Sequence, residues 1–177
     1  LLVAEYSDRL AIAAINSPTS VVLSGEAEAL EEVLELLQKR EVFIKVLPVN
    51  YAFHSPQMDS FKDELVQSLE GIQPKPAAIC LLSTVTGQPC QGPELDAEHW
   101  GNNIREPVQF NTAIERLIAD KHTLFLEISP HPVLSGYISQ CLGAEGAVLP
   151  SLRRQTEERV TMLGALGALY THGYPVD

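Results

Sequence analysis

His54 is the residue whose type and setting most suggest chemistry in this sequence. It lies in the run YAFHSP (residues 51–56), between an apolar segment and the start of an expected helix. Ser55 is of a type that caps helices, and Pro56 suits a first helical position because it needs no backbone donor there. The spacing predicts His54 at the tip of a strand-to-helix turn, where α/β enzymes place reactive groups. The positive end of the following helix would favour a neutral imidazole, which can accept a proton.

The spacing also fits a histidine without a catalytic role. Lone histidines in loops commonly do no more than hydrogen-bond a neighbouring loop, so this second interpretation stays open. The other histidines are scattered and form no ligand cluster, so the sequence predicts no metal site: His99, His122, His131 and His172. His131 stands between two prolines and is expected in a turn.

The elements that would position His54 follow from hydrophobic periodicity. Strands are expected at residues 10–15 and 20–24, joined by a tight reversal. A helix with one apolar face is expected at residues 27–40, and a third strand at residues 42–49. This order is the latter part of a β-α-β-β-α-β ferredoxin-like unit. Its first strand and most of its first helix would then lie before residue 1, with residues 1–8 as the tail of that helix.

Helices and strands alternate in the rest of the chain. Further strands are expected at residues 79–85 and 123–128, and helices at residues 56–69, 98–104, 110–120, 132–142 and 157–170. This alternation predicts an α/β fold with a parallel, doubly wound sheet. The last helix follows the basic pair Arg153 and Arg154 and carries several small residues. It could pack against a neighbouring surface or cap its own sheet.

Bulk properties exclude several classes of protein. Of the 177 residues, 45% are hydrophobic and 20% are charged, which is ordinary for a soluble globular protein. A formal net charge of −11 argues against a nucleic-acid partner, because no basic stripe is available for phosphates. The three cysteines are widely spaced, which fits a reducing cytoplasmic location better than a disulfide framework. The longest apolar runs are too short to span a membrane.

Four stretches together resemble the acyltransferase domains of modular type I polyketide synthases, in which an AFHSP run is characteristic of the active-site histidine. In the family's order, they are IAAINSP with SG (residues 12–18 and 24–25), NYAFHSPQM (50–58), NIREPVQF (103–110) and EISPHPVL (127–134). They are spread over most of the chain. The resemblance implies a multidomain synthase of antibiotics or other secondary metabolites.

The resemblance implies a fold and its divisions. The chain would be the C-terminal part of an α/β-hydrolase-like acyltransferase, whose N-terminal half is missing here. The expected divisions are an incomplete ferredoxin-like subdomain, the acyltransferase core and the post-acyltransferase linker, at residues 1–48, 49–150 and 151–177. In the family, that linker packs back on the neighbouring ketosynthase.

The resemblance also implies roles for single residues. His54 matches the base that activates a serine nucleophile, and Asn103 matches the position whose carbonyl group holds the imidazole through its other nitrogen. The serine should stand in a G-x-S-x-G elbow, and no such elbow occurs in these 177 residues. This chain alone is therefore expected to be inactive. Arg105 could clamp a carboxylate, but its Arg-Glu-Pro context favours a structural role.

The implied reaction loads an extender unit from acyl-CoA onto an acyl carrier protein through an acyl-serine intermediate. The substrate would be malonyl-CoA or methylmalonyl-CoA, with no cofactor bound in the domain itself. The carrier protein would bring its own phosphopantetheine. The ketosynthase and linker domains of the same synthase would be further partners.

Tyr51 and Phe53 bear on the extender unit, and they disagree. In the family, a bulky residue at the place of Phe53 goes with malonyl units, because it fills the space that a 2-methyl group needs. A tyrosine at the place of Tyr51 is more usual with methylmalonyl units. Steric exclusion is the more direct physical argument, so malonyl is expected. The preference should be limited, because one methylene changes the binding free energy by only about 1–3 kcal/mol.

Two other interpretations remain open. A ferredoxin-like unit with helices could serve as a non-catalytic docking or structural module of a multidomain synthase. A serine elbow before Leu1 would decide for the enzyme. The malonyl transferase of fatty-acid synthesis is a related enzyme, which the linker at residues 153–177 disfavours.

Overall fold

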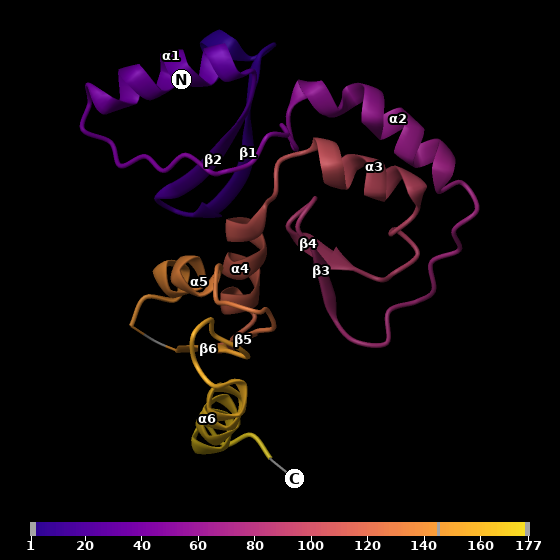
Figure 1. The fold of residues 1–177 in the computed structure, drawn as a ribbon. Coiled ribbons are helices and arrows are strands. Elements are labelled where there is room, and N and C mark those ends of the chain that lie inside the picture. Colours follow the sequence, from indigo (N-terminus) through magenta and orange to yellow (C-terminus); the bar gives the residue numbers. More distant parts are fainter. Residues whose placement is uncertain (1–2, 145, 176–177) are drawn as a thin grey trace. The chain divides into compact units, whose positions relative to one another are not determined.

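The computed structural model describes residues 3–144 and 146–175, which divide into two compact units (Figure 1). The first unit ends at Ala113, and the second begins at Ile114. This division does not coincide with the boundaries expected at residues 48 and 150, which stay predictions. Of residues 1–8, expected as the tail of a helix, residues 1 and 2 lie outside the described part, and Val3–Tyr6 forms a short 3-10 helix, η1.

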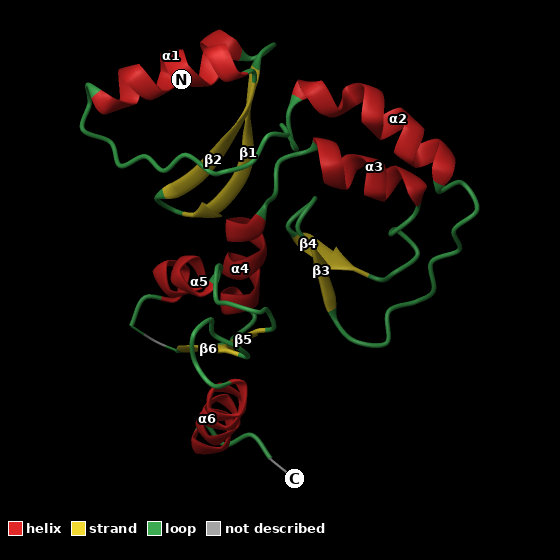
Figure 2. Ribbon diagram, in the orientation of Figure 1, coloured by secondary structure: helices red, strands yellow, loops and turns green. Residues whose placement is uncertain are grey.

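The first unit opens with the predicted hairpin and helix (Figure 2). Strands β1 (Leu10–Ser17) and β2 (Ser20–Gly25) pair antiparallel, and helix α1 (Ala27–Gln38) packs on them. Leu10, Ala29 and Val33 form the buried core between them. Gly25 has a φ of +147°, and a Cβ there would lie 2.1 Å from a backbone oxygen, so only glycine fits this turn into α1.

The third strand, predicted at residues 42–49, is wrong. These residues form no strand, and Phe43 is 89% exposed. A strand needs a neighbour that accepts and donates its backbone hydrogen bonds, and β-forming residue types alone do not supply one. Within the described residues, this segment has no such ladder partner. The described residues show a hairpin and a helix in the expected order, and the ferredoxin-like subdomain stays a prediction.

Two antiparallel helices lie side by side after this segment (Figure 1). The helix predicted at residues 56–69 forms as a 3-10 turn, η2 (Pro56–Met58), followed by α2 (Asp59–Ser68). Helix α3 (Ala97–Arg105) matches the one predicted at residues 98–104. Gly101 of α3 allows close approach, because a Cβ there would lie 2.5 Å from a methyl of Val66.

A short hairpin replaces the predicted long strand at residues 79–85. Strands β3 (Leu81–Ser83) and β4 (Gln88–Cys90) pair antiparallel around a turn that contains Gly87 at a φ of +68°. The sequence did not predict β4. Antiparallel pairing also departs from the expected parallel sheet.

The second unit contains the parallel pairing. Helix α4 (Phe110–Ala119) leads into it, and β5 (Leu124–Glu127) pairs parallel with β6 (Ala147–Pro150) through the crossover helix α5 (Ser135–Leu142). The sequence predicted these elements apart from β6. Helix α6 (Glu158–Thr171) follows and contacts β6. The α/β class is confirmed, but in the described residues the parallel, doubly wound sheet is represented only by β5–β6 and one bridge from Ala14 to Val108.

No helix in the described parts of the chain is long and apolar enough to cross a bilayer.

Candidate active site

His54 is held by the C-terminal end of α3. Its backbone N–H donates to the carbonyl of Ile104 at 2.9 Å, and its ring Nδ1 lies 2.8 Å from the carbonyl oxygen of Glu106. A carbonyl oxygen can only accept, so Nδ1 carries the proton in this arrangement. Nε2 is then the ring atom that can accept a proton from a reacting group. This geometry matches what a general base requires.

The loop around His54 combines strain with tight local bonding. His54 adopts a φ of +63°, which a residue with a Cβ adopts only where its surroundings hold it. Ser55 is fully buried, donates to the carbonyl of Ala52 at 2.7 Å and accepts from the amide of Gln57 at 3.3 Å. The predicted cap is therefore confirmed, whereas the strand predicted before the turn is absent.

The orienting bond expected from Asn103 is made by another residue. Asn103 lies inside the last turn of α3, and the ring bond goes to the main-chain carbonyl of Glu106 instead. The physical reason is that the last carbonyls of a helix have no partner inside the helix. Pro107 keeps Glu106 extended, at φ −81° and ψ 155°, which ends α3 at this point. A main-chain acceptor cannot be recognised from its side chain. The available signal in the sequence was Pro107, which marks the end of α3 and therefore where free helix carbonyls lie.

Helix ends of both polarities face the imidazole. The ring lies at the carbonyl end of α3 and just before the start of η2. The sequence predicted only the second of these ends, because the C-terminal end of α3 is distant from His54 in the chain.

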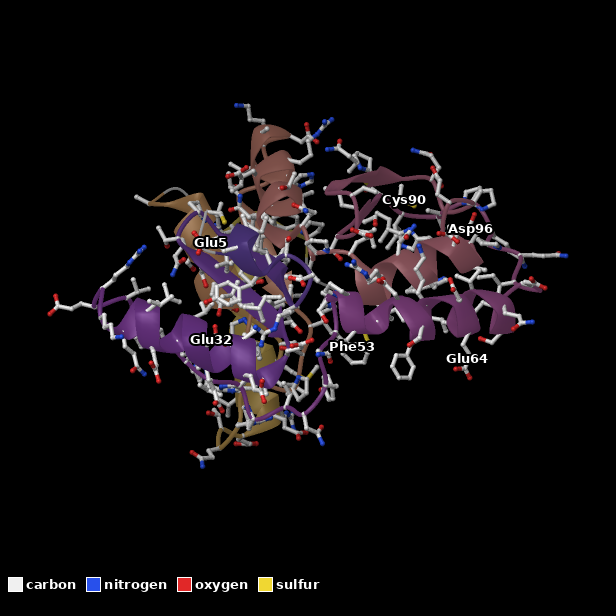
Figure 3. All side chains as sticks on the ribbon, turned by 90° about the horizontal axis from the view of Figure 1, so that it is seen from above. Glu5, Glu32, Phe53, Glu64, Cys90 and Asp96 are labelled. Atoms are coloured by element: carbon white, nitrogen blue, oxygen red, sulfur yellow. The ribbon has the colours of Figure 1, made fainter. Side chains whose placement is uncertain are left out.

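Tyr51 and Phe53 lie beside His54 on the same loop. Their ring centroids are 4.7 Å apart, and the ring of Phe53 lies 6.4 Å from that of His54. Both aromatic side chains are exposed, Tyr51 at 57% and Phe53 at 44%. Figure 3 labels Phe53 on the loop that precedes α2. The structure thus brings three of the four predicted site residues together, as a histidine next to an apolar surface.

Residues 106–109 connect this loop to the rest of the first unit. Besides the Glu106 carbonyl on His54, the amide of Val108 donates to Ala13 at 2.9 Å, and the Val108 carbonyl accepts from Ile15 at 2.9 Å. The next amide, of Gln109, donates to Thr84 at 2.6 Å. One short segment therefore fixes the histidine relative to β1 and to the loop after β3.

Arg105 makes an ion pair with Asp59, the first residue of α2. A guanidinium engaged in this way agrees with the structural role that its sequence context favoured. Nearby, Lys62 bonds Asn102 at 2.8 Å and Glu98 at 2.9 Å, which also ties α2 to α3.

In the second unit, Glu127 binds the N-terminal end of α5. Its carboxylate accepts the amides of Val133, Leu134 and Ser135 and the hydroxyl of Ser135, at 2.6–3.2 Å. Burial raises the pKa of Glu127, but the Ser135 hydroxyl and these amides outweigh it and lower the pKa to about 2. The carboxylate is thus a fixed structural anion, which the sequence did not reveal. His131 lies in the intervening bend, as predicted, and its Nδ1 accepts the amide of Arg154 at 3.3 Å.

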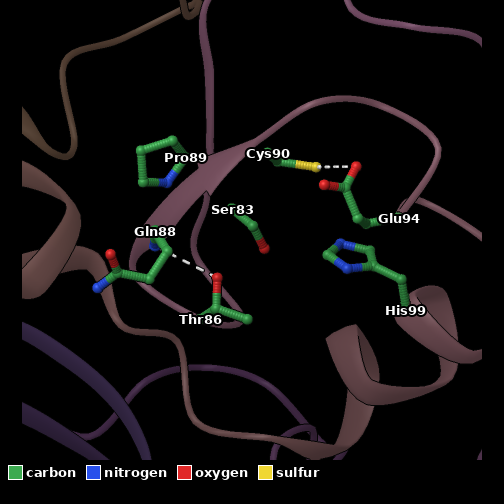
Figure 4. Close-up of a pocket in the computed structure, with 7 residues that line it drawn as sticks. All are labelled: Ser83, Thr86, Gln88, Pro89, Cys90, Glu94 and His99. Carbon is green, nitrogen blue, oxygen red and sulfur yellow. Dashed lines mark hydrogen bonds between the residues drawn. The ribbon is translucent and has the colours of Figure 1, made fainter.

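A separate pocket of about 280 Å³ lies at the β3–β4 hairpin (Figure 4). Its lining includes Cys90, whose thiol donates to Glu94 at 3.6 Å, and Thr86, whose hydroxyl accepts the amide of Gln88 at 3.2 Å. None of the predicted site residues lines it. Within the residues that the structure describes, no group of three or more ligating side chains is placed to hold a metal ion.

Comparison with known proteins places these features in context. The acyl transferase domain family matches residues 2–176. The chain is 40% identical over 167 residues to the spectinabilin polyketide synthase system protein NorA of Streptomyces orinoci, covering 92% of this chain and 9% of that protein. It is 36% identical to the erythronolide synthase EryA3 of Saccharopolyspora erythraea, covering 99% of this chain and 5% of that protein. The chain thus spans less than a tenth of the length of these relatives.

Solved structures of acyltransferases also resemble this chain. The acyltransferase domain from module 8 of the salinomycin polyketide synthase superimposes with a TM-score of 0.94 at 36% identity, over 99% of this chain and 42% of that one. The malonyl-CoA:acyl carrier protein transacylase of Xanthomonas oryzae superimposes with a TM-score of 0.81 at 26% identity, over 94% of this chain and 52% of that one.

Proposed function

The chain belongs to the acyl transferase domain family, and on that premise we propose that it carries the catalytic base of a polyketide synthase acyltransferase that loads an extender unit onto an acyl carrier protein. The bond between Nδ1 of His54 and the Glu106 carbonyl carries the proposal. It leaves Nε2 as a proton acceptor at the surface of a loop that also presents two aromatic rings.

In the first half-reaction, Nε2 of His54 takes the proton of a serine hydroxyl. The serine comes from outside these 177 residues, which contain no G-x-S-x-G elbow. The serine oxygen attacks the thioester carbonyl of the acyl-CoA, and the tetrahedral intermediate collapses with loss of coenzyme A. The imidazolium returns its proton to the departing thiolate, so the ring is neutral again.

The second half-reaction runs the same proton transfers in reverse order. His54 removes the proton from the phosphopantetheine thiol of the carrier protein, and the thiolate attacks the acyl-serine ester. The serine oxygen leaves and takes the proton from the imidazolium. Throughout, the Glu106 carbonyl holds Nδ1–H and stabilises the charged ring as it forms.

For the extender unit, we propose malonyl over methylmalonyl. The ring of Phe53 lies 4.7 Å from that of Tyr51 and 6.4 Å from that of His54, and we place it next to the acyl group on the serine that His54 would activate. A 2-methyl group would compete with this ring for volume. One methyl group in an apolar pocket changes selectivity by about 10- to 200-fold, which sets the size of the expected preference.

Residues 151–177 are proposed as a linker toward a neighbouring domain such as a ketosynthase. Helix α6 exposes Met162, Leu163 and Tyr170, which supports contact with another surface.

The test is His54→Ala in the intact synthase that carries this domain. Acyl-enzyme formation from malonyl-CoA, followed by mass spectrometry, should slow by about 100- to 10,000-fold, the usual contribution of a general base. His122→Ala, at an exposed histidine of the second unit, is the matched control and should acylate normally. Normal acylation by a folded His54→Ala variant would refute the proposal and return His54 to a loop-bonding role.

A further inference from the structure

We propose that the ion pair between Arg105 and Asp59 is a positioning device for His54, which keeps the imidazole in register with the Glu106 carbonyl. The inference rests on the proposed role of His54 as the base. It adds two residues to the site, neither of which touches the reacting groups.

Three links join the same two short segments of the chain. His54 and Asp59 are five residues apart on the first segment, and Ile104, Arg105 and Glu106 are consecutive on the second. The carbonyls on either side of Arg105 hold the backbone and the ring of His54, at 2.9 and 2.8 Å. The side chain between them reaches Asp59. The ion pair therefore closes a ring of contacts around the turn at residues 54–59.

The His54 loop needs an external hold, because its conformation is unfavourable on its own. A histidine at φ +63° relaxes toward negative φ when its neighbours release it. Such a change would rotate the imidazole away from the Glu106 carbonyl. The buried Ser55 hydroxyl restrains the side toward Ala52, at 2.7 Å, and the Asp59–Arg105 pair restrains the side toward α2.

A second ion pair between the same helices provides a close comparison. Arg105 and Asp59 have side chains that are 24% and 64% exposed, and Lys62 and Glu98 have side chains that are 23% and 60% exposed. Pairs with one partner this exposed contribute little to stability, so the two should stabilise the helix pair equally and weakly. Only Arg105–Asp59 borders the carbonyls that hold His54. If removing the two ion pairs changes the acylation rate to different extents, the difference therefore reflects the positioning of His54 and not the stability of the helix pair.

The experiment compares Asp59→Asn with Glu98→Gln in the intact synthase. Each variant neutralises the carboxylate of one α2–α3 ion pair. Asp59→Asn should slow acyl-enzyme formation from malonyl-CoA by about 10-fold or more, because a displacement of about 1 Å in a reacting group can cost about 100-fold. Glu98→Gln should acylate at the wild-type rate, and both should melt within about 2 °C of each other. Asp59→Glu keeps the charge and should recover most of the rate. Arg105→Gln should slow acyl-enzyme formation to the same extent as Asp59→Asn, because it removes the other partner of the same ion pair.

A readout independent of turnover follows the ring itself. With selectively ¹⁵N-labelled histidine, NMR should detect His54 as the Nδ1–H tautomer in the wild type and in Glu98→Gln, and as a tautomer mixture in Asp59→Asn. Equal acylation rates for Asp59→Asn and Glu98→Gln would overturn the inference, and so would a slow Asp59→Asn whose His54 signals are unchanged. His54→Ala, measured alongside, separates the two ideas. Loss of acylation there, with normal Asp59→Asn, refutes only the positioning role, whereas normal acylation in His54→Ala refutes the proposed function as well.

Discussion

Glu127→Gln should strongly destabilise the second unit at neutral pH. Glu127 is only 9% exposed as a residue, and its carboxylate accepts hydrogen bonds from the backbone amides at the start of α5. Glutamine keeps one acceptor oxygen but replaces the other with an NH₂ group, which would point its own hydrogens at those amides. It also removes the negative charge that the helix N-terminus favours.

The magnitude follows from the pKa of this carboxyl group. The value falls from 4.5 to about 2 on folding, which corresponds to about 3 kcal/mol of stabilisation at pH 7. Because the folded pKa is the lower one, this stabilisation is complete above about pH 5 and is lost as the pH falls toward 2. At pH 3, about half of it remains by the same linkage relation. The gap between wild type and Glu127→Gln should therefore shrink by about half between pH 7 and pH 3.

Urea unfolding at both pH values measures this gap. Hydrogen exchange at the amides of Val133, Leu134 and Ser135 should accelerate in the variant, since these donors lose their partner. Glu115→Gln, at an exposed glutamate of α4, is the control and should change stability by less than about 0.5 kcal/mol at either pH. A loss below about 1 kcal/mol at pH 7, or one that is the same at pH 3, would refute the linkage argument.

Three further predictions concern selectivity, packing and activity. Phe53→Ser should relax or reverse a preference for malonyl-CoA over methylmalonyl-CoA by about 10- to 200-fold, and Tyr51→His should matter less, in a competition assay of acyl-enzyme mass. A native preference for methylmalonyl would show that Tyr51 is the better guide. Gly101→Ala should destabilise the first unit by about 1–2 kcal/mol, because its Cβ would lie 2.5 Å from Val66. Gly164 is a helical glycine with open space around it, so Gly164→Ala should instead stabilise α6 by about 0.5–1 kcal/mol. Chemical unfolding measures both variants, and a change in the free energy of unfolding with the same sign in both would contradict the packing explanation. The 177 residues alone should transfer no acyl group from malonyl-CoA, and transfer that His54→Ala abolishes would show that a nucleophile was overlooked.

The elements that the sequence predicts correctly are those whose signals are local. The β1–β2 hairpin and α1 follow from short-range patterns, and their core of Leu10, Ala29 and Val33 closes within 24 residues of chain. Ser55 and Pro56 likewise start η2 through groups adjacent in sequence. The strand predicted at residues 42–49 was wrong because a strand forms only with a partner strand, and apolar residue types do not indicate whether a partner is present.

The candidate site divides in the same way. His54, Tyr51 and Phe53 lie within four residues of each other, so their proximity was available from the sequence. The partner of the ring was not, because it is a main-chain oxygen 52 residues away. Glu127 was missed for a related reason, since its partners are backbone amides whose alignment depends on how the bend before α5 turns.

Residues 106–109 have a consequence for how this chain can vary in length. The Glu106 carbonyl binds His54, both polar groups of Val108 bind β1, and the Gln109 amide binds Thr84 after β3, so four main-chain groups are fixed to three parts of the first unit. The side chains of Glu106, Val108 and Gln109 can be exchanged without changing those main-chain bonds, as long as Pro107 keeps Glu106 extended. One inserted or deleted residue would shift an extended backbone by about 3.3 Å and release either the imidazole or β1. Related sequences should therefore keep the number of residues between Ile104 and Phe110 fixed even where the letters differ. Chimeric synthases should likewise place their junctions outside this interval.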